Sequence, residues 1–150
     1  MKLSAPIYHL KRKADRIQCV AESLRVLKQG GIFAFAYINR NALYISDFCG
    51  QASIQNRNAI MDTGENGVFY GMNFGEPQEL VSRFPLQRKA HIGVDGLVYP
   101  LKARLNEASQ EEFAAYMEYH LATCEEPSLL GHSMHGLWIG RKAHLMQTES

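Results

Sequence analysis

The stretch that decides the fold runs from residue 12 to residue 38 and reads RKADRIQCVAESLRVLKQGGIFAFAYI. Over residues 12–29 apolar side chains recur at helical spacing and charged side chains take the other side. Gly30-Gly31 supplies the glycine that commonly ends a helix. Residues 32–38 are a continuous apolar run, typical of a strand buried on both faces of a sheet. Helix, glycine pair and buried strand in this order predict an α/β fold.

Weaker patterns predict the elements that follow directly. Residues 41–49 and 56–62 each predict a short helix. Residues 64–75 contain four glycines and predict a turn-rich surface loop, because their spacing matches neither the dinucleotide fingerprint nor the P-loop. Pro77 suits the first turn of a helix that ends near Arg83.

The carboxyl-terminal part predicts two more strands and two more helices. Residues 86–94 and 136–140 are the expected strands. Residues 97–105 predict a helix in spite of Pro100, which disfavours one. Ser109 and Glu112 have the spacing of a capping box and open the last helix.

Length and composition limit the class of protein. The 150 residues suit a single domain spanning residues 1–150. Sixteen Lys and Arg against fifteen Asp and Glu give a net charge of +1, which excludes a nucleic-acid partner bound through a strongly basic field. The longest apolar run is too short to span a membrane. Three cysteines without a CxxC pair predict reduced thiols and a cytoplasmic protein.

Several side chains are candidates for a site, each with a structural alternative. Asn39 and Arg40 follow a buried strand, where α/β sheets bind ligands, but they are equally explained by helix capping and a solvated cation. Tyr8-His9 precedes the first helix and either faces a ligand or caps the helix. His132 and His135 lack the companion ligands of a zinc site, so no metal is expected.

Residues 22–35, ESLRVLKQGGIFAF, resemble the E-x-x-R-V-L-K-P-G-G segment of class I S-adenosylmethionine-dependent methyltransferases, with Gln29 in place of the proline. Residues 6–10, PIYHL, resemble the G-P-L-Y-H-L stretch of one bacterial branch of that family. Residues 92–97, 118–125 and 137–142 resemble the closing region of the same branch. The resemblance therefore extends from residue 6 to residue 142.

The resemblance implies a partial Rossmann-like methyltransferase sheet of about three strands with several helices. The last strand, residues 136–140, would be antiparallel and lie in the middle, between strand 32–38 and strand 86–94. In the family, the outer edge of strand 32–38 pairs with a strand that we expect to be missing here. An exposed edge invites association, so the expected partner is a second copy, giving a homodimer through strand 32–38, or a missing amino-terminal half.

The resemblance also implies S-adenosylmethionine as cofactor and an unknown small molecule as methyl acceptor. Tyr8 and His9 would contact the cofactor, His9 would be the catalytic base, and Asn39, Arg40 and Tyr44 would face the acceptor. In the family the glycine-rich turn that grips the cofactor precedes the PIYHL stretch, and only five residues precede it here. The lone chain is therefore expected to be truncated and inactive. The alternative is a non-catalytic, self-associating remnant or interaction module.

Overall fold

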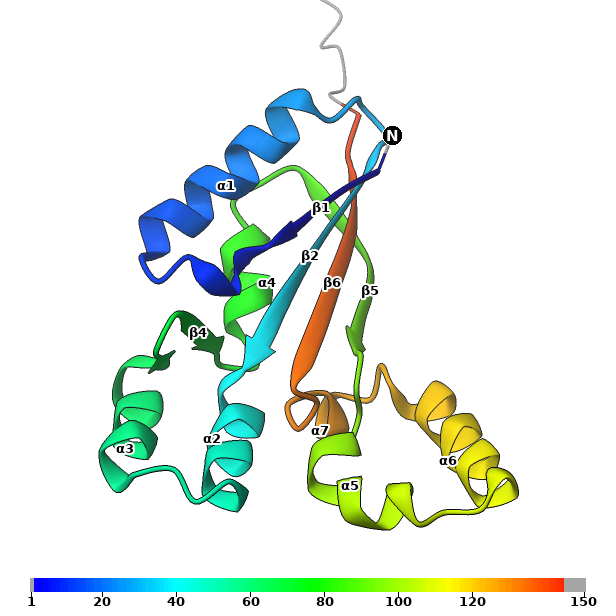
Figure 1. Ribbon diagram of the computed structural model, residues 1–150. Coiled ribbons are helices and arrows are strands. Elements are labelled where there is room, and N and C mark those ends of the chain that lie inside the picture. The colour runs from blue at the N-terminus through cyan, green and yellow to red at the C-terminus, as the bar shows by residue number, and fades with distance from the viewer. Residues whose placement is uncertain (1, 145–150) are drawn as a thin grey trace, which may run out of the picture.

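The computed structural model describes residues 2–144, which form an α/β fold (Figure 1). The elements, in chain order, are β1 (Lys2–Pro6), the short 3-10 helix η1 (Ile7–His9), α1 (Lys13–Val26), β2 (Ile32–Asn39), α2 (Arg40–Cys49), α3 (Ile54–Thr63), β3 (Glu65–Asn66), β4 (Phe69–Met72), α4 (Glu76–Val81), β5 (Leu86–Gly93), α5 (Val98–Asn106), α6 (Gln110–Thr123), α7 (Pro127–Leu130) and β6 (His135–Lys142).

The centre of the sheet has the strand order that the resemblance implies. β6 lies between β2 and β5 and is antiparallel to both. Trp138 in the middle of β6 is opposite Phe35 of β2 and His91 of β5. The prediction of an α/β chain with a partial Rossmann-like sheet is therefore confirmed, but the predicted number of about three strands is wrong, because β1, β3 and β4 extend the sheet to six strands.

The outer edge of β2 is paired within the chain. β1 runs parallel to β2, from the pair Lys2 and Ile32 to the pair Pro6 and Ala36. Beyond β1, the end of β2 pairs with β4, where Ile38 is opposite Gly71. The prediction of an exposed edge on strand 32–38 is wrong, because five residues before Ile7 are enough to form a strand. The prediction of a loop over residues 64–75 is also wrong, because β3 and β4 form a small hairpin there.

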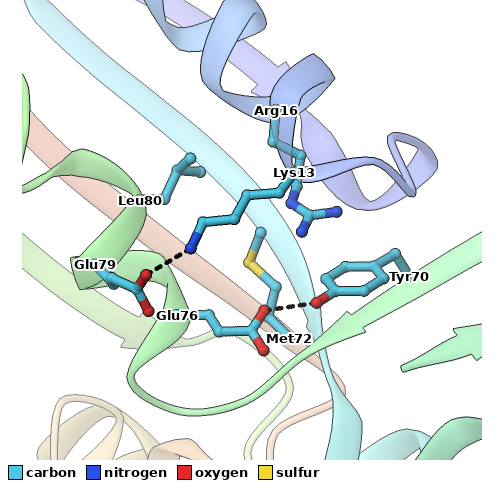
Figure 2. A pocket seen from close by; sticks show the side chains of 7 residues that line it. All are labelled: Lys13, Arg16, Tyr70, Met72, Glu76, Glu79 and Leu80. Atoms are coloured by element: carbon cyan, nitrogen blue, oxygen red, sulfur yellow. Dashed lines mark hydrogen bonds and ion pairs between the residues drawn. The ribbon is translucent and has the colours of Figure 1, made fainter. Parts of the chain in front are cut away.

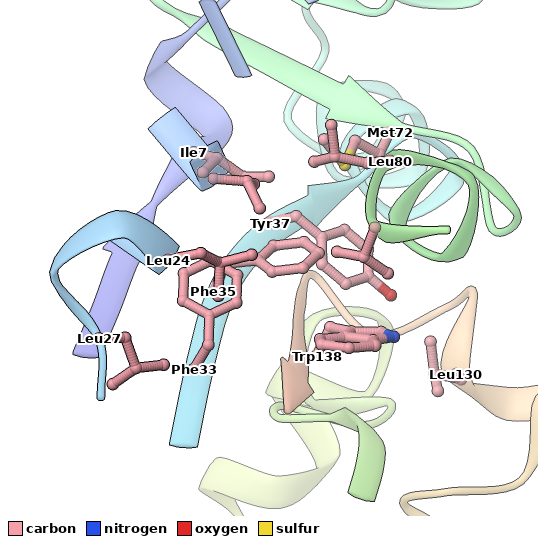
Figure 3. Packing of buried hydrophobic residues seen from close by; sticks show 12 residues of the cluster. Ile7, Leu24, Leu27, Phe33, Phe35, Tyr37, Met72, Leu80, Leu130 and Trp138 are labelled. Carbon is pink, nitrogen blue, oxygen red and sulfur yellow. The ribbon is translucent and has the colours of Figure 1, made fainter. Parts of the chain in front are cut away.

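One face of the sheet is covered by helices. α1 and α4 lie along this face (Figure 1), and the large side chains of β2 and β6 point toward them (Figure 3). Phe33, Phe35, Tyr37 and Trp138 are fully buried there. Burying a side chain of this size contributes about 1.5–3 kcal/mol, so this layer is the main source of stability.

The opposite face of the same strands is not packed in this way. The side chains that alternate with the buried ones are only half-buried, namely Ile32, Ala34, Ala36, Ile92, Leu137 and Ile139. We call these six residues the open face. The prediction that strand 32–38 is buried on both faces is wrong for the described part of the chain, since no described helix covers the open face.

The helices begin and end where local signals are strongest. α6 opens with the predicted capping box, in which Ser109 Oγ accepts from Glu112 N and Glu112 Oε2 accepts from Ser109 N. Pro100 lies in the first turn of α5, where a missing N–H does no harm. α1 ends at Val26, earlier than residue 29, because Leu27 adopts an extended backbone.

A glycine on β6 makes room for a tyrosine on β2. A Cβ atom at Gly136 would overlap the Tyr37 ring. Because Gly136 has no side chain, Tyr37 crosses β6 and its hydroxyl lies 2.7 Å from Nε2 of His91 on β5. Burial raises the pKa of Tyr37, so the hydroxyl keeps its proton and can donate it to His91 in a hydrogen bond when Nε2 carries the lone pair.

Within residues 2–144, no helix combines the length and the apolar character that a membrane crossing requires.

Candidate functional site

Four aromatic rings meet near the carboxyl end of β1. The Tyr8 ring centre lies 4.6 Å from that of His9 and 6.0 Å from that of Phe69, and the His9 and Phe69 centres are 5.3 Å apart. The His135 ring approaches Tyr8 edge-on, at 6.3 Å. We call Tyr8, His9, Phe69 and His135 the edge site. It occupies the edge of the sheet at which α/β proteins bind ligands.

A carboxylate fixes the orientation of His135. Asp95, just beyond the end of β5, places Oδ2 2.6 Å from the backbone nitrogen of His135 and 2.8 Å from its ring Nδ1. An ionised carboxylate only accepts hydrogen bonds, so Nδ1 carries a hydrogen, and in the neutral form of the ring the lone pair is then on Nε2. Nε2 has no protein partner among the described residues. The arrangement can therefore accept a proton from a bound molecule.

Sequence patterns do not predict this pair. Asp95 and His135 are far apart in sequence, and His135 was considered only as a metal ligand beside His132. The antiparallel pairing of β5 with β6 brings them together, with Gly93 opposite Gly136. The only available signal was an Asp-Gly turn after a predicted strand.

Tyr8 and Tyr44 border a second apolar cluster, which also contacts Phe69 of the edge site. This cluster contains Ile38, Ala42, Leu43, Ile60 and Met134, and Tyr8 and Tyr44 pack against it. The His9 side chain is exposed. Of the predicted site residues, Tyr8 and His9 thus lie together at the edge of the sheet, and Tyr44 borders the same cluster.

Asn39 is buried, with 1% of its surface exposed, and its side chain stabilises the turn that follows α7. Its Nδ2 donates to the carbonyl oxygens of Leu130 at 3.0 Å and Ser133 at 2.6 Å. Its Oδ1 has no hydrogen-bond partner in the described part of the chain. We therefore do not count Asn39 among the side chains that reach a ligand at the edge site.

Arg40 points away from the edge site, toward β4 and α4. Its Nε donates to Gly71 O at 3.2 Å, and its Nη2 lies 3.5 Å from Glu76 Oε1. Glu76 Oε2 in turn accepts from the Tyr70 hydroxyl at 2.9 Å. Burial and the neighbouring Glu76 raise the pKa of Tyr70, so this hydroxyl stays protonated. The structure thus separates Arg40 from Tyr8 and His9.

Among residues 2–144, no three His, Cys, Asp or Glu side chains are grouped closely enough to hold a metal ion. Cys19, Cys49 and Cys124 are free thiols.

Comparison with models of known protein families gives no match for this chain, and comparison with curated proteins also finds no significant relative.

Proposed function

We propose that this chain forms the acceptor side of an S-adenosylmethionine-dependent methyltransferase that acts on a small molecule. The support from sequence is the resemblance of residues 6–142 to the carboxyl-terminal half of that family. The support from structure is the strand order β1-β2-β6-β5 with β6 reversed, which agrees with the topology that the resemblance implies.

The observation that carries the proposal is the unpacked open face. Parallel sheets of α/β proteins normally have helices on both faces, because both faces of their strands are apolar. In this chain α1 and α4 cover one face, and Ala36, Leu137 and Ile139 on the other remain half-buried. The outer edge of β1 also has no partner strand among the described residues. An amino-terminal half, with its own strands and helices, would cover both surfaces and would supply the glycine-rich cofactor loop.

The edge site would then lie between cofactor and acceptor. Methyl transfer is a direct displacement at the sulfonium methyl group, so the protein must orient the acceptor and remove its proton. Tyr8 and His9 would border the cofactor. His135 is a better-oriented base than His9, since Asp95 holds its ring while His9 has no carboxylate partner in the described residues.

The coding sequence immediately upstream of Met1 tests where the other half comes from. The proposal expects a reading frame there that encodes an apolar strand followed by a glycine-rich turn. Co-expression of that frame should yield a stable complex with this chain and S-adenosylmethionine binding. An upstream region without such a frame would leave the cofactor loop without a source and would count against the proposal.

The second candidate is a self-associating interaction module without catalysis. It is favoured by the outer edge of β1, since a second copy could pair there, β1 to β1. This replaces strand 32–38 as the dimer edge. A dimer in sedimentation equilibrium, together with no response to the cofactor, would favour this candidate over the first.

A further inference from the structure

A pocket of about 170 Å³ lies between α1, α4 and β4, on the helix-covered side of the sheet (Figure 2). Its walls carry four charged side chains, Lys13, Arg16, Glu76 and Glu79. One water molecule needs only about 10–15 Å³, so the pocket has room for a small organic molecule. It is distinct from the edge site, because Tyr70 lines it while the adjacent Phe69 points to the other side of β4.

Arg16 is the unusual member of this pocket. Only 5% of its surface is exposed, and its guanidinium carbon lies 3.9 Å from the centre of the Tyr70 ring. Its Nη1 donates to the carbonyl oxygens of Leu10 at 2.7 Å and Lys11 at 2.6 Å. Nη1 is the one guanidinium nitrogen with a hydrogen-bond partner among residues 2–144, and no carboxylate there is within ion-pair distance of Arg16. A buried cation without a counter-charge is unfavourable, so an external anion would stabilise this arrangement.

The other charges around the pocket are already paired. Glu76 accepts from Tyr70 and faces Arg40, as described above. At the exposed mouth, Lys13 Nζ lies 2.6 Å from Glu79 Oε1, and this pair lowers the pKa of Glu79. Arg16 is therefore the one lining cation that lacks a carboxylate partner among the described residues. A single negative charge would balance it, whereas a dianion such as phosphate would be repelled by the two carboxylates.

The floor of the pocket is apolar. Met72 and Leu80 line it and are nearly fully buried beneath the charged rim. We propose that the pocket binds a small monocarboxylate with a short aliphatic chain. The carboxylate would accept from Nε and Nη2 of Arg16, which present the planar fork that suits it, and the chain would lie on Met72 and Leu80. This proposal is independent of methyl transfer.

Titration of the isotope-labelled full chain with sodium butyrate, followed by NMR, tests the proposal. Saturable shifts are expected at the Arg16 side-chain Nε–H and the Met72 methyl group, with a Kd on the order of 1–10 mM for so small a ligand. n-Butylammonium has the same number of carbon atoms and the opposite charge, and it should leave both signals unchanged. Sodium chloride at equal ionic strength is the reference.

Two charge reversals on α1 form a matched pair. Lys13→Glu adds negative charge at the mouth of the pocket and should weaken butyrate binding about fivefold or more. Arg25→Glu makes the same change at an exposed ion pair with Glu22, at the other end of α1, and should change the Kd by less than about twofold. Both sites are exposed, so both variants should fold. Arg16→Gln should abolish the saturable binding of butyrate.

Four results would overturn the proposal. The first is the absence of saturable chemical-shift changes up to about 100 mM butyrate, because an organised site would bind butyrate more tightly than this. The second is an equal response to n-butylammonium, and the third is an equal response to phosphate. The fourth is the same effect from Lys13→Glu as from Arg25→Glu. If Arg16→Gln does not fold, the Lys13 and Arg25 variants still decide.

Discussion

One oxygen of Asp95 contacts His135 twice, at 2.6 Å from its backbone nitrogen and 2.8 Å from its ring Nδ1. The first contact ties the start of β6 to the segment after β5, and the second fixes the direction of the imidazole ring. A carboxylate that holds a histidine in one tautomer is a common way to prepare a base. The same pair therefore connects the stability of the sheet with the chemistry of the edge site.

Substitution of Asp95 separates these two roles. Asp95→Ala should destabilise the chain by about 2 kcal/mol, because both hydrogen bonds involve a charged group. The chemical shift of His135 Nδ1 in nitrogen-15 NMR spectra should then move from the value of a single tautomer toward that of a mixture of tautomers. Glu111→Ala, at an exposed position in the first turn of α6, is the control and should change stability by less than about 1 kcal/mol. An unchanged tautomer in Asp95→Ala would show that Asp95 does not orient the ring.

Gly136 should not tolerate a side chain. The Cβ of Gly136→Ala would overlap the Tyr37 ring, which fills the space above β6, so overpacking should reduce stability by about 1–3 kcal/mol. Gly131→Ala is the matched control, since an added Cβ there meets nothing within 4 Å and the backbone φ is −66°. Urea denaturation of both variants measures the difference. Equal stabilities would mean that Tyr37 does not cross β6 at this point.

His91 should make stability depend on pH. Burial, with a smaller contribution from the charge of Arg88, lowers the pKa of His91 to about 4. An unfolded histidine has a pKa of about 6.5, so between these values the unfolded chain binds the extra proton. The contribution of His91 to the free energy of unfolding is complete above about pH 6.5 and is lost as the pH falls toward 4. Between pH 4 and 6.5 the unfolding free energy should change by about 1 kcal/mol per pH unit on average, below the 1.4 of one full proton because the two states differ by less than one bound proton across this range.

His91→Gln isolates this contribution from those of the other histidines. A glutamine can still accept from the Tyr37 hydroxyl but does not titrate. The difference in unfolding free energy between the two chains should grow as the pH is raised from 4 to 6.5. A constant difference over that range would contradict the lowered pKa.

The open face should respond to mutation quite differently from the packed face. Leu137 and Trp138 are neighbours on β6 whose side chains point to opposite faces. Leu137→Glu should change stability by about 1 kcal/mol or less and reduce the binding of a hydrophobic dye. Trp138→Ala should destabilise by about 3–5 kcal/mol. Strong destabilisation by Leu137→Glu, or undiminished dye binding, would mean that the open face is already covered.

Most of the fold was predictable because its signals are local. Three signals each depend on residues close together in the sequence, and each predicts an element that the structure contains. They are the helical period before Gly30-Gly31, the apolar run of residues 32–38 and the Ser109–Glu112 capping box. β1 was not predictable in this way, because five residues are too few to show a hydrophobic periodicity. Its formation depends on the edge that β2 offers.

The site was harder to predict, because its contacts join distant parts of the chain. Arg16 is a charged residue on an amphipathic helix, a pattern that indicates exposure, yet Tyr70 and the carbonyl oxygens of Leu10 and Lys11 enclose it. An apolar run also indicates that other elements pack against the strand, but it does not indicate which elements these are. The open face is the result: residues 32–38 are apolar on both sides, and the described helices cover one.

The most direct test of the central claim is an NMR titration of the full chain with S-adenosylhomocysteine, the demethylated product of the cofactor. We expect weak binding, because the glycine-rich loop is not among these residues, with chemical-shift changes confined to Tyr8, His9, Phe69 and His135. Adenosine alone, which lacks the amino-acid part, should shift fewer of these signals. No response at the edge site at millimolar concentration, or a response located elsewhere on the chain, would contradict the claim that this chain is the acceptor side of a methyltransferase.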